Sequence, residues 1–213
     1  MLVVLGDVVA SRRFEDESAL LAGLSRALAG VNDHVTGVRP LALHVRDEFA
    51  AVYPDLGTAA TAALRLRLAT DDLVLRTDEG VDEPVELRLG LGFGDTVGDD
   101  HASGAAWELA RAARAAAEEL AGRRTWPGSV RSRCRSDDRL LEATVNAHLL
   151  LQDQLLARMD ARDRRALRGL LDGERQVDVA AALGVTQPAI ARRLRDRGAL
   201  AVHRALEDLR AAT

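Results

Sequence analysis

The sequence is short of several residue types, and each shortage narrows the possibilities. All 29 basic residues are arginine, a bias typical of a GC-rich genome that indicates no function by itself. Aromatic residues make up only 3% of the chain. Cys134 is the only cysteine, so no disulfide can form within the chain. The five histidines are too scattered along the sequence to predict a zinc site. We therefore expect a protein of the reducing cytoplasm.

The first residues carry no pattern typical of export or membrane insertion. The apolar stretch at residues 2–9 is short, follows no basic region and is interrupted by Asp7. A signal peptide or membrane span is therefore not expected, and no membrane partner is predicted. Hydrophobic residues make up 47% of the chain, which is enough for a sizeable buried core.

Charge is distributed unevenly along the chain, whose formal net charge is −4. Residues 1–130 contain 13 Arg and 21 acidic residues, a net charge of −8. Residues 131–213 contain 16 Arg and 12 acidic residues, a net charge of +4. A surface that binds a polyanion is therefore expected in the second part, whereas the acidic first part is better suited to cations.

Hydrophobic periodicity predicts the order strand, helix, strand, strand, helix, strand, helix in the first part of the chain. An acidic loop is expected at residues 71–83, before the last of these strands. This order is typical of a split βαβ, ferredoxin-like α+β sheet covered by helices. The strands are expected at residues 2–9, 41–45, 49–53 and 85–94, and the helices at residues 18–32, 58–69 and 103–121.

The Pro and Gly near residue 127, together with the arginine-rich stretch to residue 135, predict a domain boundary. We expect a sheet domain at residues 1–130, a linker and connector helix at residues 131–159, and an all-α domain at residues 160–213. The connector helix has an unusually wide apolar face, which indicates burial against another domain or another subunit. A homodimer is therefore predicted.

The C-terminal part contains two helical stretches separated by Gly184 and Val185. The spacing is that of a helix-turn-helix, in which the glycine takes the positive φ of the turn and the small Ala180 lets the helices cross closely. Thr186 is placed to cap the second helix, and Pro188 is tolerated in its first turn.

The outward face of that second helix carries residues that suit DNA. Gln187 can pair with adenine in the major groove, and Arg192 and Arg195 with guanine. Arg193 or Arg197 would instead hold phosphates, which fixes register without reading sequence. The alternative is an ordinary helical hairpin with a solvated basic face.

Two carboxylates in the first part are candidates for a divalent cation. Asp7 ends the first buried strand and Asp47 lies in the hairpin turn, and a ferredoxin-like sheet can place these positions side by side. Mg²⁺ held by one or two carboxylates, water and phosphate oxygens is common in nucleotide sites. The alternative is that both acids are structural. Asp7 would then cap a turn, and Asp47 and Glu48 would be solvent-exposed polar residues of the hairpin.

A nucleotide site beside these acids is the corresponding prediction. Ser11, Arg12 and Arg13 follow the first strand, where backbone N–H groups and guanidinium groups can meet phosphates. Arg46 precedes the hairpin acid and is assigned to the same site. The glycines in LGLGFGD have the spacing G-x-G-x-G, which does not fit a dinucleotide loop; a bend or the close approach of a ligand explains them more simply.

Several motifs together resemble the SatD family of bacterial proteins. They are GDVVASR near the start, DEF at residues 47–49, SGAAWELARAA at residues 103–113, and the terminal TQPAIARRLRDRG. The resemblance spans nearly the whole chain and implies the same architecture, a sheet domain followed by a helix-turn-helix.

The first half is also similar to class III nucleotide cyclases and to GGDEF-type diguanylate cyclases. In those enzymes, one acid after the first strand and another in the hairpin hold two metals, and Asp7 and Asp47 match these positions. Arg46 stands where the resemblance predicts a glycine, and Glu108 where it predicts a transition-state Asn. The resemblance therefore implies a cyclase-like fold, with nucleotide sensing favoured over catalysis.

These observations predict a transcriptional regulator in which a cyclase-like sensing domain is joined to a DNA-binding domain. The alternative is a Mg²⁺-dependent cyclase-type enzyme that the helix-turn-helix localises on DNA. A scaffold that binds other proteins through the connector helix is a third possibility.

Overall fold

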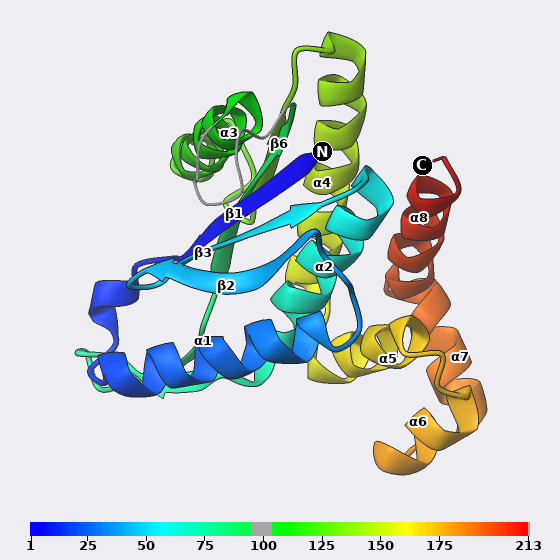
Figure 1. Cartoon of the computed structure of the whole chain (residues 1–213). Helices are drawn as coiled ribbons and strands as arrows, with labels where there is room; N and C mark the ends of the chain where they lie inside the picture. Colours follow the sequence, from blue (N-terminus) through cyan, green and yellow to red (C-terminus); the bar gives the residue numbers. More distant parts are fainter. Residues whose placement is uncertain (95–103, 213) are drawn as a thin grey trace.

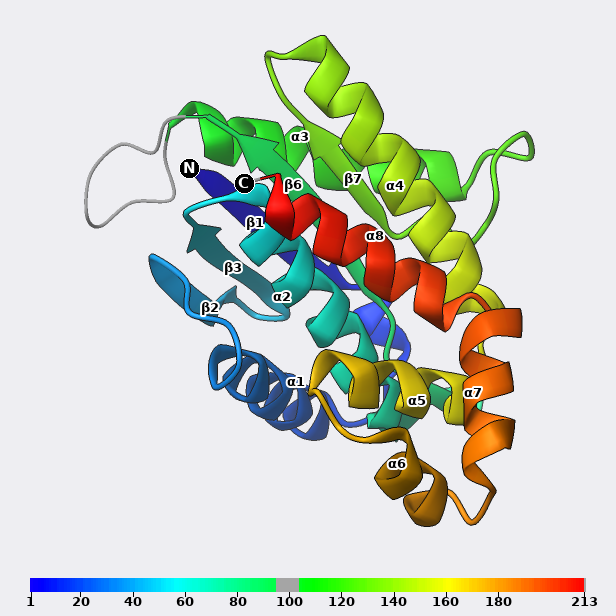
Figure 2. The same ribbon diagram turned by 90° about the vertical axis from the view of Figure 1, so that its right-hand side faces the viewer.

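The computed structural model describes residues 1–94 and 104–212, so Asp95 and Ser103, which belong to two of the motifs, lie outside the described residues. Figures 1 and 2 show a sheet with helices on both faces and a group of C-terminal helices at one side. The strands are β1 (Leu2–Val8), β2 (Arg39–Val45), β3 (Glu48–Tyr53), β4 (Val74–Arg76), β5 (Asp82–Pro84), β6 (Leu87–Phe93) and β7 (Ser132–Arg135). The helices are α1 (Glu17–Asn32), α2 (Leu56–Ala69), α3 (Ala105–Ala121), α4 (Arg139–Arg158), α5 (Ala161–Leu171), α6 (Gln176–Ala182), α7 (Gln187–Asp196) and α8 (Ala199–Ala211), with two short 3-10 turns, η1 (Ser11–Arg13) and η2 (Thr70–Asp72).

The main sheet has the strand order β2-β3-β1-β6-β7. Strand β1 pairs antiparallel with both β3 and β6, and β6 pairs parallel with β7. Without β7, this is the four-stranded antiparallel order of a ferredoxin-like fold. The α+β class expected from the sequence is therefore confirmed, with α5 to α8 as an all-α group after it. The acidic stretch at residues 71–83, expected to be a loop, instead contains η2 and the small β4–β5 pair.

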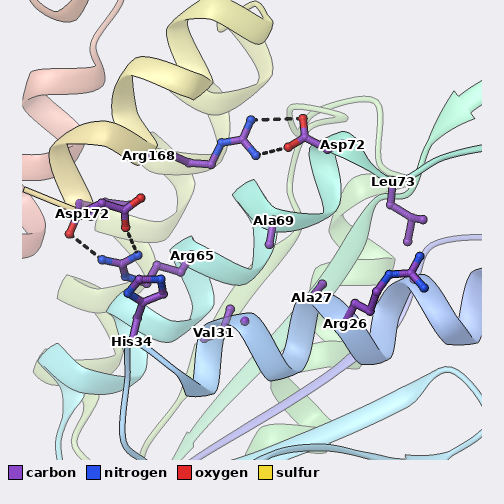
Figure 3. A pocket seen from close by; sticks show the side chains of 13 residues that line it. Arg26, Ala27, Val31, His34, Arg65, Ala69, Asp72, Leu73, Arg168 and Asp172 are labelled. Carbon is purple, nitrogen blue, oxygen red and sulfur yellow. Dashed lines mark hydrogen bonds and ion pairs between the residues drawn. The ribbon is translucent and has the colours of Figure 1, made fainter. Parts of the chain in front are cut away.

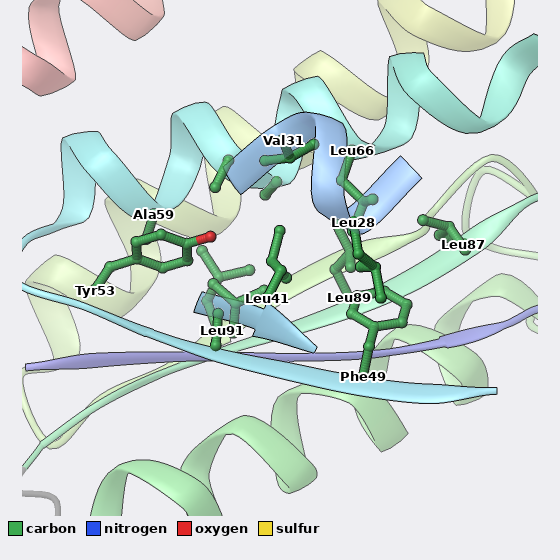
Figure 4. Close-up of a cluster of buried hydrophobic side chains, with 14 of the residues drawn as sticks. Leu28, Val31, Leu41, Phe49, Tyr53, Ala59, Leu66, Leu87, Leu89 and Leu91 are labelled. Atoms are coloured by element: carbon green, nitrogen blue, oxygen red, sulfur yellow. The ribbon is translucent and has the colours of Figure 1, made fainter. Parts of the chain in front are cut away.

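Strand β1 lies at the centre of the sheet, and both of its faces are buried. Val4 and Val8 belong to the core that α1 and α2 cover, whereas Val3 and Leu5 pack on the opposite face against α3. Alternate residues of a strand point to opposite faces, so a strand that is apolar from Leu2 to Leu5 needs cover on both sides. Figure 4 shows the larger core, in which side chains from α1 and α2 meet those of the sheet.

Local sequence explains where the covering helices begin. The Asp16 carboxylate accepts a hydrogen bond from Ala19 N at 2.8 Å, and Asp55 accepts one from Thr58 N at 2.7 Å. Each aspartate thus satisfies one of the backbone donors that a helix start leaves free. The buried residues of α1 follow the helical repeat and face the sheet; they are Leu20, Gly23, Leu24, Leu28 and Val31.

Two glycines of β6 let α3 lie directly on the sheet. A Cβ at Gly90 would lie 2.1 Å from Ala110 O, and one at Gly92 would lie 2.1 Å from Ala106 O. Both distances are far below van der Waals contact. The described residues thus explain Gly90 and Gly92 by the close approach of a helix, where the sequence had suggested a bend or the close approach of a ligand.

Strand β7 lies at the edge of the sheet, and α4 covers its open side. Asn146 accepts from Cys134 N at 2.8 Å and donates to Cys134 O at 3.0 Å. The fully buried Asp153 accepts from Arg131 N at 2.7 Å and from Ser132 N at 2.8 Å. These side chains replace the hydrogen bonds of a missing neighbour strand. The sheet therefore continues past residue 130, while the division of the chain into separately folding domains stays a prediction.

The C-terminal helices share a core with the sheet region. Leu64 and Leu68 of α2 pack in one cluster with Ile190, Leu194 and Val202 from α7 and α8. Figure 2 shows α8 lying along α2, with α5, α6 and α7 at one end. In the described part of the chain, no helix is long and apolar enough to cross a membrane.

Helix α4 places its apolar face inside the chain. Val145 and Leu149 join the main core, and Leu156 joins the core of the C-terminal helices. The sequence predicted that this face packs against another domain or another subunit. In the structure it packs against other parts of the same chain. Leu140 and Leu151 remain on the outside, 77% and 64% exposed. The dimer stays a prediction.

Candidate functional site

The end of β1 and the β2–β3 turn form one wall of an open cavity of about 430 Å³. Five of the residues predicted for the metal and nucleotide sites line it, namely Asp7, Ser11, Arg12, Arg46 and Asp47. They meet because β1 and β3 are paired neighbours, with Gly6 opposite Phe49 at this end of the sheet. Asp47 also accepts a long hydrogen bond, 3.4 Å, from Val8 N.

Arg13, the sixth predicted residue, points elsewhere. Its guanidinium pairs with Glu83 at 2.7 Å and lies over the Phe14 ring, 5.2 Å from the centroid. The turn η1 separates the side chains of Arg12 and Arg13, so only Arg12 lines the cavity.

Two arginines that the sequence reasoning did not assign lie beside Asp7. Arg88 of β6 is 3.3 Å from Asp7 Oδ2 and 3.4 Å from Glu118 Oε1. Arg114 of α3 is 3.5 Å from Asp7 Oδ2 and 2.7 Å from Glu48 Oε1. One signal was present: the alternation of Val85, Leu87, Leu89 and Leu91 places Arg88 on the opposite face of its strand. Its pairing with Asp7 follows only from the sheet register.

The Asp7 carboxyl is in a mixed environment. Burial raises its pKa above the ordinary value, the charges of Arg88 and Arg114 lower it, and nearby Asp47 and Glu118 raise it again. Its Oδ1 atom is buried and has no hydrogen-bond partner among the described residues. A carboxyl with one unsatisfied buried oxygen is suited to holding a proton or accepting a hydrogen bond from a bound molecule.

The same contacts test whether Mg²⁺ fits here. Asp7 and Asp47 do converge, but the guanidinium groups of Arg88 and Arg114 already lie beside Asp7 Oδ2. Within the described residues, no group of three or more His, Cys, Asp or Glu side chains is placed to hold a metal ion. The positive charges of Arg88 and Arg114 beside Asp7 would repel a Mg²⁺ ion bound to the same carboxylate. The described residues therefore do not fit a resident Mg²⁺ ion.

The hairpin turn departs from the cyclase-like pattern in a specific way. Arg46 has a φ of +52°, the left-handed conformation that a glycine adopts without cost. The backbone thus takes the glycine-like shape although the residue is arginine, and its side chain pairs with Glu17 of α1 at 2.9 Å. Glu108 is exposed on α3, 2.7 Å from Arg111, and does not line the cavity.

The second candidate site is the pair α6 and α7, joined by a tight turn. Gly184 has a φ of +65°, and Val185 N donates to Ala180 O at 3.0 Å. Ile190 and Leu194 are buried on the inner side of α7. Thr186 occupies the N-cap position by its backbone, and its exposed side chain makes no capping hydrogen bond. The turn and inner face match the helix-turn-helix geometry predicted from the sequence.

The outer face of α7 carries fewer free cations than the sequence suggested. Gln187, Arg192 and Arg195 are exposed, and Gln187 donates to Gln176 at the start of α6 at 3.0 Å. Arg193 turns inward, where it pairs with Asp160 and Asp163 of α5. The helical repeat could not reveal this, because the acids lie about thirty residues earlier.

The chain is therefore an α+β protein in which a ferredoxin-like sheet is followed by helices arranged as a helix-turn-helix. No protein-family model matches the sequence, and no curated protein matches it. A solved structure that it resembles is the GGDEF domain of DgcB from Caulobacter crescentus in complex with c-di-GMP, at 19% identity and a TM-score of 0.41. The similarity covers 63% of this chain and 76% of that one.

Proposed function

We propose that the protein binds DNA through α7 and acts as a transcriptional regulator. The observation that supports this proposal is the division of α7 into two faces. Ile190, Leu194 and Arg193 fix the inner face, while the outer face carries Arg192 and Arg195, which form no ion pair with another described residue. A helix held in this way can enter the major groove without rearranging its own contacts.

The polar residues at the start of α7 extend this face. Thr186 and Gln187 are exposed at the N-terminal end of the helix, which is the end that contacts base edges in helix-turn-helix proteins. Gln187 and Arg192 provide the donor and acceptor patterns that read adenine and guanine. Residues 131–213, which include α7, carry a net charge of +4, whereas the whole chain carries −4. A positive net charge in this part of the chain favours binding of a polyanion such as DNA.

The DNA proposal is tested by selection from random-sequence duplexes, followed by fluorescence anisotropy at fixed salt. In the double variant Arg192→Ala/Arg195→Ala, we expect sequence preference to be lost and affinity for the selected duplex to fall at least tenfold. The matched control is Arg124→Ala/Arg139→Ala, which removes two exposed arginines far from α7. Equal losses in both double variants, or no selected sequence, would contradict the proposal.

The cavity beside Asp7 is proposed to bind a phosphate-bearing ligand such as a nucleotide. Arg12 supplies positive charge, Arg46 lines the same cavity while paired with Glu17, and the Ser11 hydroxyl and Asp7 supply hydrogen bonds. Catalysis is the weaker alternative, because the described residues fit no resident metal and Glu108 points away. Two of the four motifs that resemble the SatD family lie at these places, GDVVASR at the cavity and TQPAIARRLRDRG along α7.

Nucleotides titrated with and without Mg²⁺ test this part of the proposal. We expect a nucleotide to raise the melting temperature of the wild type and of Arg13→Ala, and not of Arg12→Ala. Arg13 is the matched control because it belongs to the same turn, η1, and does not line the cavity. Cyclic product at several turnovers per minute, lost in Asp47→Asn, would favour the enzyme instead.

A homodimer remains part of the proposal, since two copies on a palindrome give a single helix-turn-helix useful specificity. We propose its interface on the outer face of α4, where Leu140 and Leu151 are exposed. Light scattering of the wild type and of Leu151→Glu at micromolar concentration tests it, and a monomeric wild type with undiminished DNA affinity would rule it out.

A further inference from the structure

A second cavity lies at the junction of α1, α2 and α5, away from both proposed sites. Its volume is about 440 Å³, within the range of pockets that hold small molecules. Figure 3 shows it running along α1, with α2 and α5 on the other side. Its walls therefore come from the sheet region and from the C-terminal helices, a common setting for ligand sites.

The polar groups of this junction cavity are mostly basic. Arg65 pairs with Asp172 at 2.5 Å, and the Arg168 guanidinium pairs with Asp72, its Nη2 donating at 3.2 Å. Arg26 is exposed, and its guanidinium has no partner among the described residues. Three arginines thus face two aspartates, so the cavity keeps an unmatched positive charge near its end at Leu73.

The floor of the cavity is built from small and apolar residues of two helices. Ala27, Gly30 and Val31 line it from α1, and Ala69 lines it from α2. A Cβ built on Gly30 would meet no heavy atom within 4 Å. The space beside α1 is therefore open to a flat apolar group, with Arg26 four residues away on the same side of the helix.

We propose that the junction cavity binds a small organic anion, with a carboxylate or phosphate on an apolar body. The anionic group pairs with Arg26, and the apolar body lies on Ala27, Gly30 and Val31. The existing pairs Arg65–Asp172 and Arg168–Asp72 stay intact and bound the opposite wall. Such an occupant lies in a cavity lined by both α1 and α5, so its binding should stabilise the docking of the C-terminal helices on the sheet region.

The probe for this site is 8-anilinonaphthalene-1-sulfonate, an anion on an apolar body that becomes fluorescent away from water. With the full-length wild type, we expect saturable binding of one dye molecule. Gly30→Phe introduces a bulky side chain at a lining residue whose Cβ would meet no heavy atom within 4 Å, and it removes a glycine from a helix, so we expect the fold to be retained. This variant should lose the binding, and Arg26→Glu should weaken it at least tenfold.

Ala29→Phe is the matched control, because Ala29 is exposed on α1 and does not line the cavity. It should bind the dye as the wild type does, and urea unfolding should show that all variants are folded. Benzoate and phenyl phosphate then compete with the dye: displacement by one identifies a carboxylate or a phosphate as the preferred group. Dye binding that survives Gly30→Phe, or displacement by neither competitor, would overturn the proposal. Each readout is independent of DNA and of nucleotides.

Discussion

Arg193 of α7 and Asp163 of α5 form an ion pair at 2.8 Å, in which the carboxylate is only 2% exposed. Asp163 also belongs to the capping box that begins α5, together with Asp160, and Asp160 accepts a further hydrogen bond from Arg193. The pair thus joins the start of one helix to the middle of another. It fixes the orientation of α7 and removes Arg193 from the face proposed to bind DNA.

We expect Arg193→Ala to lower the free energy of unfolding by about 1–3 kcal/mol, because it leaves a buried carboxylate without its charged partner. Arg195→Ala should change it by no more than about 0.5 kcal/mol, since that side chain is exposed. Urea unfolding followed by circular dichroism compares the two. If both variants have the wild-type midpoint, Arg193 does not have the structural role assigned to it.

Gly92→Ala should destabilise the protein by about 3 kcal/mol or more. The added Cβ would lie 2.1 Å from Ala106 O and 2.4 Å from Ala110 N, which are backbone atoms of α3 that cannot move singly. Gly128→Ala is the control, because its Cβ meets nothing within 4 Å, and a change within about 0.5 kcal/mol is expected. Similar midpoints for the two variants in urea would contradict the close packing of α3.

The stability contributed by Asp7 should decrease with rising pH. Burial is the largest effect and raises the folded-state pKa above its ordinary value, so folding favours the protonated carboxyl. This contribution is fully present below the unfolded pKa, about 4, and is lost as the pH rises through the folded pKa. Urea unfolding at pH 4 to 7 should show the wild type losing stability relative to Asp7→Asn over this range. A difference that does not vary with pH would contradict the assignment.

Cys134 should be unreactive in the folded protein. The thiol is 1% exposed on β7, and burial raises its pKa to about 12, so almost no thiolate is present at pH 8. A disulfide reagent such as Ellman's reagent should therefore react at least a hundredfold more slowly with native protein than with protein in urea. Native reactivity close to the unfolded rate would show that β7 and α4 open freely.

The order of elements followed from the sequence because it depends on local patterns. The apolar run of β1, the hairpin residues around Asp47 and the helical repeat of α1 each need only neighbouring residues to be recognised. The turn between α6 and α7 was equally local, since Gly184 supplies its positive φ. The short β7 was not predicted, because it is stabilised by Asn146 and Asp153, which come later in the chain.

The sequence by itself thus determined the ferredoxin-like order of strands and helices, and the presence of two acids after β1 and in the hairpin. Tertiary structure alone decided what surrounds those acids. Arg88 and Arg114 come from β6 and α3, and only sheet register and helix packing bring them to Asp7. The direction of Arg193 was decided in the same way, by acids on α5. The physical reason is range: periodicity and turn chemistry act between near neighbours, whereas ion pairs and shared cores join residues that only the folded chain brings together.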